Sequence, residues 1–259
     1  SRADAYFGTE ADHIAQHPAF AYFAGLPGEH GLSGDHFATW LTAGSGQLHW
    51  DQLADGFGIK ALPVGHSGRA PGLWAKADLD RLPDIAGRTI NASALATAVA
   101  KEFGAVPAAG DDGDLREVPM GITAAVADGV TKHHKVWFPD GIHWQGLAQS
   151  FGMQAGLWHG LSDSDRAIIS SCASESYHQC LAEHDAHDKA VAPHLFASQG
   201  IARRPLPDDV RRAIAHVAEG LVLHAATQHE ATANVHESYM LFRQSFVGDP
   251  PIGVAGALV

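Results

Sequence analysis

The chain has 259 residues, of which 46% are hydrophobic and 18% are charged, a balance typical of a globular protein with a substantial core. Its formal net charge of −12 argues against a nucleic-acid-binding surface, because no basic face offsets it. No apolar run approaches the roughly 20 residues that cross a bilayer, and no signal peptide is recognised in the sequence.

The first half of the chain predicts alternating helices and strands. Helical spacing of apolar residues over 37–53 is interrupted by Gly44-Ser45-Gly46. A short buried strand follows at 59–64 and a second at 88–90. Ser93 is then a good N-cap for a helix over 94–103. An extended piece begins at 106, so strand, helix and strand follow one another as in a βαβ unit.

The second half is mostly helical. A strand is predicted at 135–138, and helices at 164–192, 207–229 and 231–246, with a turn at Gly200 and a short strand between the first two helices. Asp208 and Asp209 suit the positive end of the second helix dipole. The order of elements predicts an α/β protein with a helical C-terminal third.

Neither the cysteines nor the basic residues point to a special environment. Cys172 and Cys180 lie eight residues apart on one predicted helix, about 12 Å along its axis, which is too far for a disulfide. The cysteine content therefore does not indicate the cellular compartment of the protein. The densest basic group is interpreted as solubility charges flanking a helix: Arg203, Arg204, Arg211 and Arg212.

Signatures of catalysis are absent, so no catalytic residue, no enzymatic activity and no cofactor are predicted. The chain has 18 histidines, and their scatter favours a solvated surface over metal binding. The best candidate for a metal is His184, His187 and Asp188, which share one helix face. A polar outer stripe on an amphipathic helix is the preferred interpretation, so no metal site is predicted. Of the six tryptophans, Trp74 and Trp144 follow glycine-rich loops and are the best candidates to line a cleft.

The C-terminal region resembles the solute-binding proteins of tripartite ATP-independent periplasmic (TRAP) transporters. Residues 158–169 read WHGLSDSDRAII, and a long helix follows them. GIARRPLPDDV at 200–210 and ESYMLFRQSF at 237–246 continue the resemblance in the family's order. Upstream the similarity is looser, at GSGQLHWDQL (44–53), GHSG (65–68) and FPDGIH (138–143).

The resemblance implies a two-lobed α/β fold of the type II periplasmic-binding-protein kind, with long C-terminal helices. We expect residues 1–63 and 126–160 to form the first lobe and residues 64–125 and 161–246 the second, with a tail at 247–259. The family's opening strand–helix–strand has no counterpart, so a reduced first lobe is expected. The family's members capture a small organic acid between the lobes in the periplasm and then dock on a membrane permease. The long helix, which carries no chemistry, then serves as scaffold and as a possible homodimer contact.

The chain departs from the family where the ligand is expected. Asn91 stands where the family has the arginine that holds the ligand carboxylate, and asparagine cannot neutralise that charge. Ala70 replaces a glutamine and Trp144 replaces a glutamate, and the family's Glu-Trp pair has no counterpart at 121–130. The pocket that the resemblance predicts is made of His66, Trp74, Asn91, His143 and Trp144.

Two functions follow from this pattern. One is a solute receptor with an altered pocket, suited to a neutral or aromatic solute. The other is a solute-binding-protein-like scaffold that has lost its ligand and serves as an accessory subunit of a periplasm-facing membrane complex.

Overall fold

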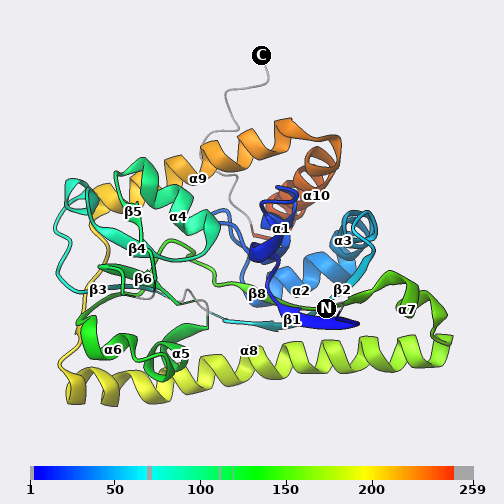
Figure 1. Cartoon of the computed structure of the whole chain (residues 1–259), viewed down its shortest axis with the longest axis horizontal. Coiled ribbons are helices and arrows are strands. Elements are labelled where there is room, and N and C mark those ends of the chain that lie inside the picture. Colours follow the sequence, from blue (N-terminus) through cyan, green and yellow to red (C-terminus); the bar gives the residue numbers. More distant parts are fainter. Residues whose placement is uncertain (1–2, 69–71, 111, 119, 248–259) are drawn as a thin grey trace.

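The computed structural model describes residues 3–68, 72–110, 112–118 and 120–247, and it places them around two β-sheets (Figure 1). Each sheet belongs to one lobe. No helix in this described part of the chain is both long enough and apolar enough to span a membrane.

The first lobe is built on a three-stranded antiparallel sheet in the order β1-β8-β2. The strands are β1 (Ala5–Gly8), β8 (Ala148–Gln154) and β2 (Ile59–His66). Strand β2 pairs with β8 from Ile59↔Gln154 to His66↔Ala148, and the register shifts between Pro63 and Gly65. The central strand β8 therefore comes from a segment that begins 82 residues after the end of β2 (148 − 66), which ties two distant parts of the chain into one sheet.

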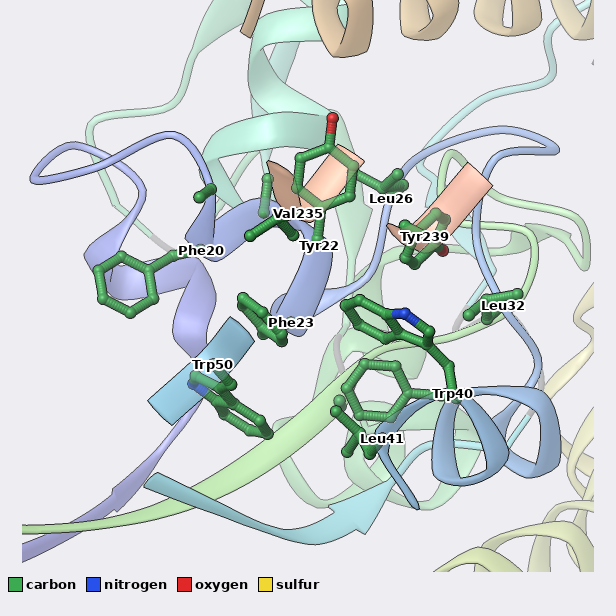
Figure 2. Close-up of a cluster of buried hydrophobic side chains, with 14 of the residues drawn as sticks. Phe20, Tyr22, Phe23, Leu26, Leu32, Trp40, Leu41, Trp50, Val235 and Tyr239 are labelled. Atoms are coloured by element: carbon green, nitrogen blue, oxygen red, sulfur yellow. The ribbon is translucent and has the colours of Figure 1, made fainter. Parts of the chain in front are cut away.

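An aromatic cluster forms the core of the first lobe (Figure 2). The Phe23 ring lies between the rings of Trp40 and Trp50, with centroid distances of 5.3 and 5.0 Å and nearly parallel planes. The elements around this core are η1 (Glu10–His13), α1 (Phe20–Ala24), α2 (Gly34–Ala43), α3 (Gly46–Asp55) and α10 (Glu230–Phe246).

The second lobe contains a six-stranded sheet in the order β5-β4-β6-β3-β7-β9. Its strands are β5 (Val106–Pro107), β4 (Thr89–Asn91), β6 (Leu115–Glu117), β3 (Leu73–Ala75), β7 (Val136–Phe138) and β9 (Ala202–Arg203). Strand β3 is antiparallel to both of its neighbours, and the other pairings are parallel. The carboxyl ends of β4, β6, β7 and β9 therefore share one edge.

Apolar side chains cover both faces of this sheet. On one face Ile90, Leu115 and Phe138 share a buried cluster with residues of α4 (Ala94–Glu102), α9 (Asp208–Gln228) and η2 (Leu82–Ile85). On the other face Trp74 and Trp137 pack with residues of α5 (Gly121–Ala127), α6 (Val130–His133) and the end of α8. The short strands are thereby fixed by packing rather than by their own length.

Helix α8 (Asp163–Gln199) follows α7 (Ala155–Gly160) and runs along both lobes (Figure 1). Its Tyr177 hydroxyl donates to the Gly34 carbonyl in the first lobe, at 2.7 Å. In the second lobe its Asp188 carboxylate accepts a hydrogen bond from the Ile122 amide at 3.1 Å. The helix ends at Gln199, and Gly200, with a φ of +63°, forms a left-handed C-terminal cap where the sequence predicts a turn.

Most predicted elements are present, with shifted ends. The helix predicted at 164–192 continues to Gln199 although Pro193 lies inside it, because Leu195 and Phe196 pack into the second lobe. Strands β1 and β8 and helix α5 are not predicted. Gly152 interrupts the apolar pattern of β8, and its missing side chain leaves the space that the Tyr6 ring fills.

Two elements pack with a different sheet from the one that the expected lobe ranges imply, and the lobe boundaries themselves stay a prediction. Strand β7 lies within the range 126–160 assigned to the first lobe, but it pairs with β3 in the second sheet. Helix α10 lies within 161–246, assigned to the second lobe, but its Val235, Tyr239 and Phe242 are buried in the first core. Both differences arise because helix α9 and the β7–β8 connection carry the chain from one lobe back to the other.

The stacking of Phe23 between Trp40 and Trp50 predicts a large loss of stability when one of the two tryptophans is truncated. We expect Trp50→Ala to lower the free energy of unfolding by about 3–5 kcal/mol, because the fully buried ring leaves a cavity. Leu48→Ala, on the same helix but 58% exposed, should change it by less than about 1 kcal/mol. Urea denaturation of both variants measures the difference, and equal losses would contradict a core role for Trp50.

Candidate functional site: an interlobe cleft

A cleft of about 940 Å³ lies between the two lobes and along α8. The first lobe contributes the start of α2, the second contributes the carboxyl edge of its sheet, and α8 contributes one long side. The principal side chains that line it are Asp35, Ser67, Trp137, Asp140, Trp144, His184, Asp188, Phe196 and Arg203. A molecule bound in this cleft contacts both lobes.

Two segments of the chain cross between the lobes beside the cleft: the first follows β2, and the second connects β7 to β8. These two crossovers are hydrogen-bonded to each other. The Ser67 amide donates to the Leu147 carbonyl at 2.9 Å, and the Leu147 amide donates to the Ser67 hydroxyl at 2.9 Å. The Gly28 amide of the first lobe also donates to the Ile142 carbonyl at 2.8 Å. The crossovers thus behave as one connection rather than as two independent linkers.

A buried hydrogen-bonded pair, Glu117 and His143, anchors the connection between β7 and β8 to the second sheet. Glu117, the last residue of β6, accepts hydrogen bonds from the Ile142 amide at 2.7 Å, the His143 amide at 3.0 Å and His143 Nδ1–H at 2.7 Å. Burial alone raises the pKa of the Glu117 carboxyl, but the charge of His143 and these hydrogen bonds outweigh burial, so the net pKa is lowered. His143 Nε2 is buried without a partner among the described residues.

Three predicted pocket residues are buried away from the cleft lining. His66 lies against the rings of Phe37 and Tyr177, and its Nδ1 accepts the Gly68 amide at 3.0 Å. Trp74 is fully buried. His143 is hydrogen-bonded to Glu117 through Nδ1.

Of the two other predicted pocket residues, one lines the cleft and one does not. Trp144 lines the cleft, and the Arg211 guanidinium lies 5.0 Å above its ring. Asn91 does not line it, and its side-chain amide donates to the Gly110 carbonyl at 3.0 Å. Ala70 lies outside the described residues. The structure therefore does not bring the five predicted residues together in the cleft, and a ligand role for them stays a prediction.

The metal candidate on α8 is also divided. Asp188 is occupied by α5, because its carboxylate accepts the Ile122 and Thr123 amides at 3.1 and 3.3 Å. His184 lines the cleft, whereas His187 lies in a smaller hollow of about 330 Å³ beside it. Among the residues that the structure places, no group of three His, Cys, Asp or Glu side chains is arranged to hold a metal ion.

Trp137 and Arg203 line the cleft, a position that the sequence predicts for neither of them. Both stand at or next to the carboxyl ends of parallel strands, where ligands of open α/β sheets bind. Trp137 also explains Gly72, since a Cβ at that glycine would lie 1.9 Å from the indole Nε1. The sequence predicts the strand at 135–138 that contains Trp137. It does not give the order of the strands in the sheet, so it does not show at which edge the carboxyl end of this strand lies.

Comparison with solved structures gives clear matches. A TRAP transporter solute-binding protein from Bordetella bronchiseptica, with calcium and picolinate in its site, superposes with a TM-score of 0.87 at 17% identity, over 95% of this chain and 75% of that one. A TRAP periplasmic solute-binding protein from Pseudoalteromonas atlantica, with sodium and pyruvate, gives 0.86 at 16% identity, over 95% and 77%. An extracytoplasmic solute receptor from Bordetella pertussis that binds pyroglutamic acid gives 0.73 at 16% identity, over 92% and 80%.

The chain has the fold of the TRAP solute-binding proteins. No family model matches the sequence, and neither does any curated protein. The two-lobed α/β fold expected from the sequence resemblance is confirmed. In this TRAP fold the cleft lies between the lobes, beside the crossovers and α8.

His66 predicts a loss of stability in acid. Burial, and secondarily the charge of His184, lower its pKa from 6.5 to about 3. The unfolded chain therefore binds a proton that the folded chain excludes, and stability falls as the pH drops below about 6.5. Between pH 7 and pH 5 we expect His66→Asn, which keeps an acceptor for Gly68, to lose about 2 kcal/mol less than the wild type. Urea unfolding at both pH values measures this, with exposed His216→Asn as the control; identical losses in the wild type and His66→Asn would contradict it.

The buried Glu117–His143 pair predicts a second effect on the stability of the fold. We expect Glu117→Gln to lower the free energy of unfolding by about 3–5 kcal/mol, because the amide keeps one acceptor oxygen and puts an NH2 donor where Oε2 accepts from His143 Nδ1–H. Glu102→Gln, at an exposed position on α4, is the matched control and should change it by less than about 0.5 kcal/mol. A Glu117→Gln variant as stable as the control would show that the pair contributes nothing.

Proposed function

We propose that this chain is a TRAP-type extracytoplasmic solute-binding protein that captures a small organic solute in its interlobe cleft for uptake. The observation that carries the proposal is the cleft itself, which is lined from both lobes and from α8. Its volume of about 940 Å³ lies within the usual range for small-molecule sites. A solute that touches both lobes stabilises their closed arrangement, because its contacts are complete in that arrangement alone.

The similar solved structures support a small organic solute. They hold picolinate, pyruvate and pyroglutamic acid, which are small organic acids. The cleft walls of this chain contain two tryptophans and Phe196. We therefore infer an altered pocket that prefers an aromatic or otherwise apolar solute to a simple keto acid.

The same proposal includes a location and a partner. The protein acts outside the cytoplasm, and its closed form docks on a membrane permease that takes over the solute. A homodimer through the outer side of α8 is part of the same expectation, since many residues of that helix are exposed.

A second function is favoured by one observation. His66, Trp74 and His143, which the sequence resemblance places in the pocket, are sealed in the interior. A scaffold that has lost its ligand, serving as an accessory subunit of a periplasm-facing membrane complex, needs the fold and the long helices but no open pocket.

A ligand screen by thermal unfolding separates the two functions. Organic acids, amino acids and aromatic acids are each added to the full chain. A receptor saturated at a hundred times its Kd gains about 2.7 kcal/mol of stability, which raises Tm by several degrees. If no class raises Tm and the protein copurifies with a membrane complex, the receptor function is wrong and the scaffold function is favoured.

Trp144 tests whether the solute occupies the cleft. We expect Trp144→Ala to lose most of the ligand-induced rise in Tm, because it removes an aromatic wall. Trp158→Ala is the matched control, since Trp158 lies on α7 under the Lys60 ammonium, outside the cleft lining, and should keep the full rise. Equal rises in both variants would place the solute elsewhere.

A further inference from the structure

We propose that Arg203 is the anion anchor of the cleft, binding the carboxylate of a solute whose apolar body lies against Phe196. This inference rests on the proposed solute-binding function and adds to it the anchoring residue and the chemical class of the solute. It also replaces the interpretation of Arg203 as a solubility charge.

The position of Arg203 is set by strand pairing. It is the last residue of β9 and pairs in register with Trp137 of β7, at the carboxyl edge of the second sheet. Its guanidinium lies 5.8 Å above the Trp137 ring, and the Phe196 ring is 5.1 Å from that of Trp137. All three line the cleft. By contrast the adjacent Arg204 does not line it and pairs with Asp78 at 3.3 Å.

Two of the acidic side chains that line the cleft are paired with other basic groups. Asp140 pairs with Arg211 at 3.8 Å, and Asp185 pairs with Lys189 at 2.5 Å. Arg203 has no acidic partner among the residues that the structure places. It is therefore an uncompensated cation in this wall of the cleft.

The remaining acids of the lining do not neutralise Arg203 either. Asp188 is committed to the amides at the start of α5. Asp35 lies on the first-lobe wall, in the first turn of α2, where the positive end of the helix dipole stabilises its charge. Neither forms an ion pair with Arg203 in the described structure.

The position of the guanidinium over Trp137 prepares it for a carboxylate. A guanidinium that lies over an aromatic ring keeps its N–H donors free at its edge, and their fork matches the two oxygens of a carboxylate. The contact with the ring also limits the rotamers of the side chain, so less entropy is lost on binding. Beside these donors, Phe196, Ala192 and Ile122 offer an apolar surface to the rest of the solute.

This chemistry selects a monocarboxylate with an aromatic or apolar body. It places the anchor on β9, at one edge of the sheet, whereas the sequence resemblance places the carboxylate at Asn91 on β4. Three strands separate β4 from β9 in the sheet order. The solute would therefore bind toward the β9 end of the cleft.

Matched pairs of probes test the inference. Benzoate and picolinate are compared with benzamide and picolinamide, which keep the ring but lose the charge, together with the carboxylate that performs best in the ligand screen. Titration calorimetry is carried out on the wild type, Arg203→Gln and Arg204→Gln. We expect a carboxylate to bind the wild type and Arg204→Gln alike, and Arg203→Gln about tenfold or more weaker, with the amides weak throughout. The Tm of each variant without ligand checks its folding.

Other outcomes overturn the inference in distinguishable ways. If Arg203→Gln binds the carboxylate as the wild type does, or if only uncharged or cationic solutes bind, Arg203 is not the anchor, while the proposed receptor function stands. If no solute of the screen and none of the four probes binds the wild type, the receptor function fails, and the anchor fails with it.

Discussion

The arrangement of the two lobes depends on the hydrogen bonds that the Glu117 carboxylate accepts. The crossover from β7 to β8 passes through the interior, where water cannot satisfy its backbone amides. Glu117 accepts two of those amides and the imidazole of His143, so one buried charge fixes the path of the connection. Its desolvation cost is offset only because three donors converge on it. The cleft wall that follows, at Trp144, takes its position from this anchor.

Helix α8 adds a second constraint, because it bonds to both lobes. Tyr177 and Ser176 hold it to carbonyls of the first lobe, and Asp188 holds it to α5 of the second. Its first half is mostly exposed, so it packs along the molecule rather than through it. A relative movement of the lobes must therefore bend α8, slide along it or break one of these contacts. The cleft lies where those contacts change from one lobe to the other.

Sequence patterns identify the long elements of this fold and fail at the short ones. The helices at 208–228 and 230–246 follow from their apolar spacing and agree with prediction within two residues. Strand β8 contains Gly152, whose pairing partner Tyr6 lies far away in the sequence, and nothing local marks it as a strand. The cleft shows the same limit. The sequence predicts a cleft position for Trp144 because this residue follows a glycine-rich loop. The cleft position of Arg203 follows only from the strand order, which puts the end of β9 at the carboxyl edge of the second sheet.

The buried residues explain why this fold carries a different inner surface from the one that its sequence resemblance implies. His66 and His143 keep their places in the motifs, but each is committed to local bonds that hold a crossover. Residues that fix the backbone in this way say little about what is bound. The side chains free to change are those that reach the cleft from strand ends and from α8. If the proposed solute-binding function holds, recognition depends on that outer set, which a shared fold does not determine.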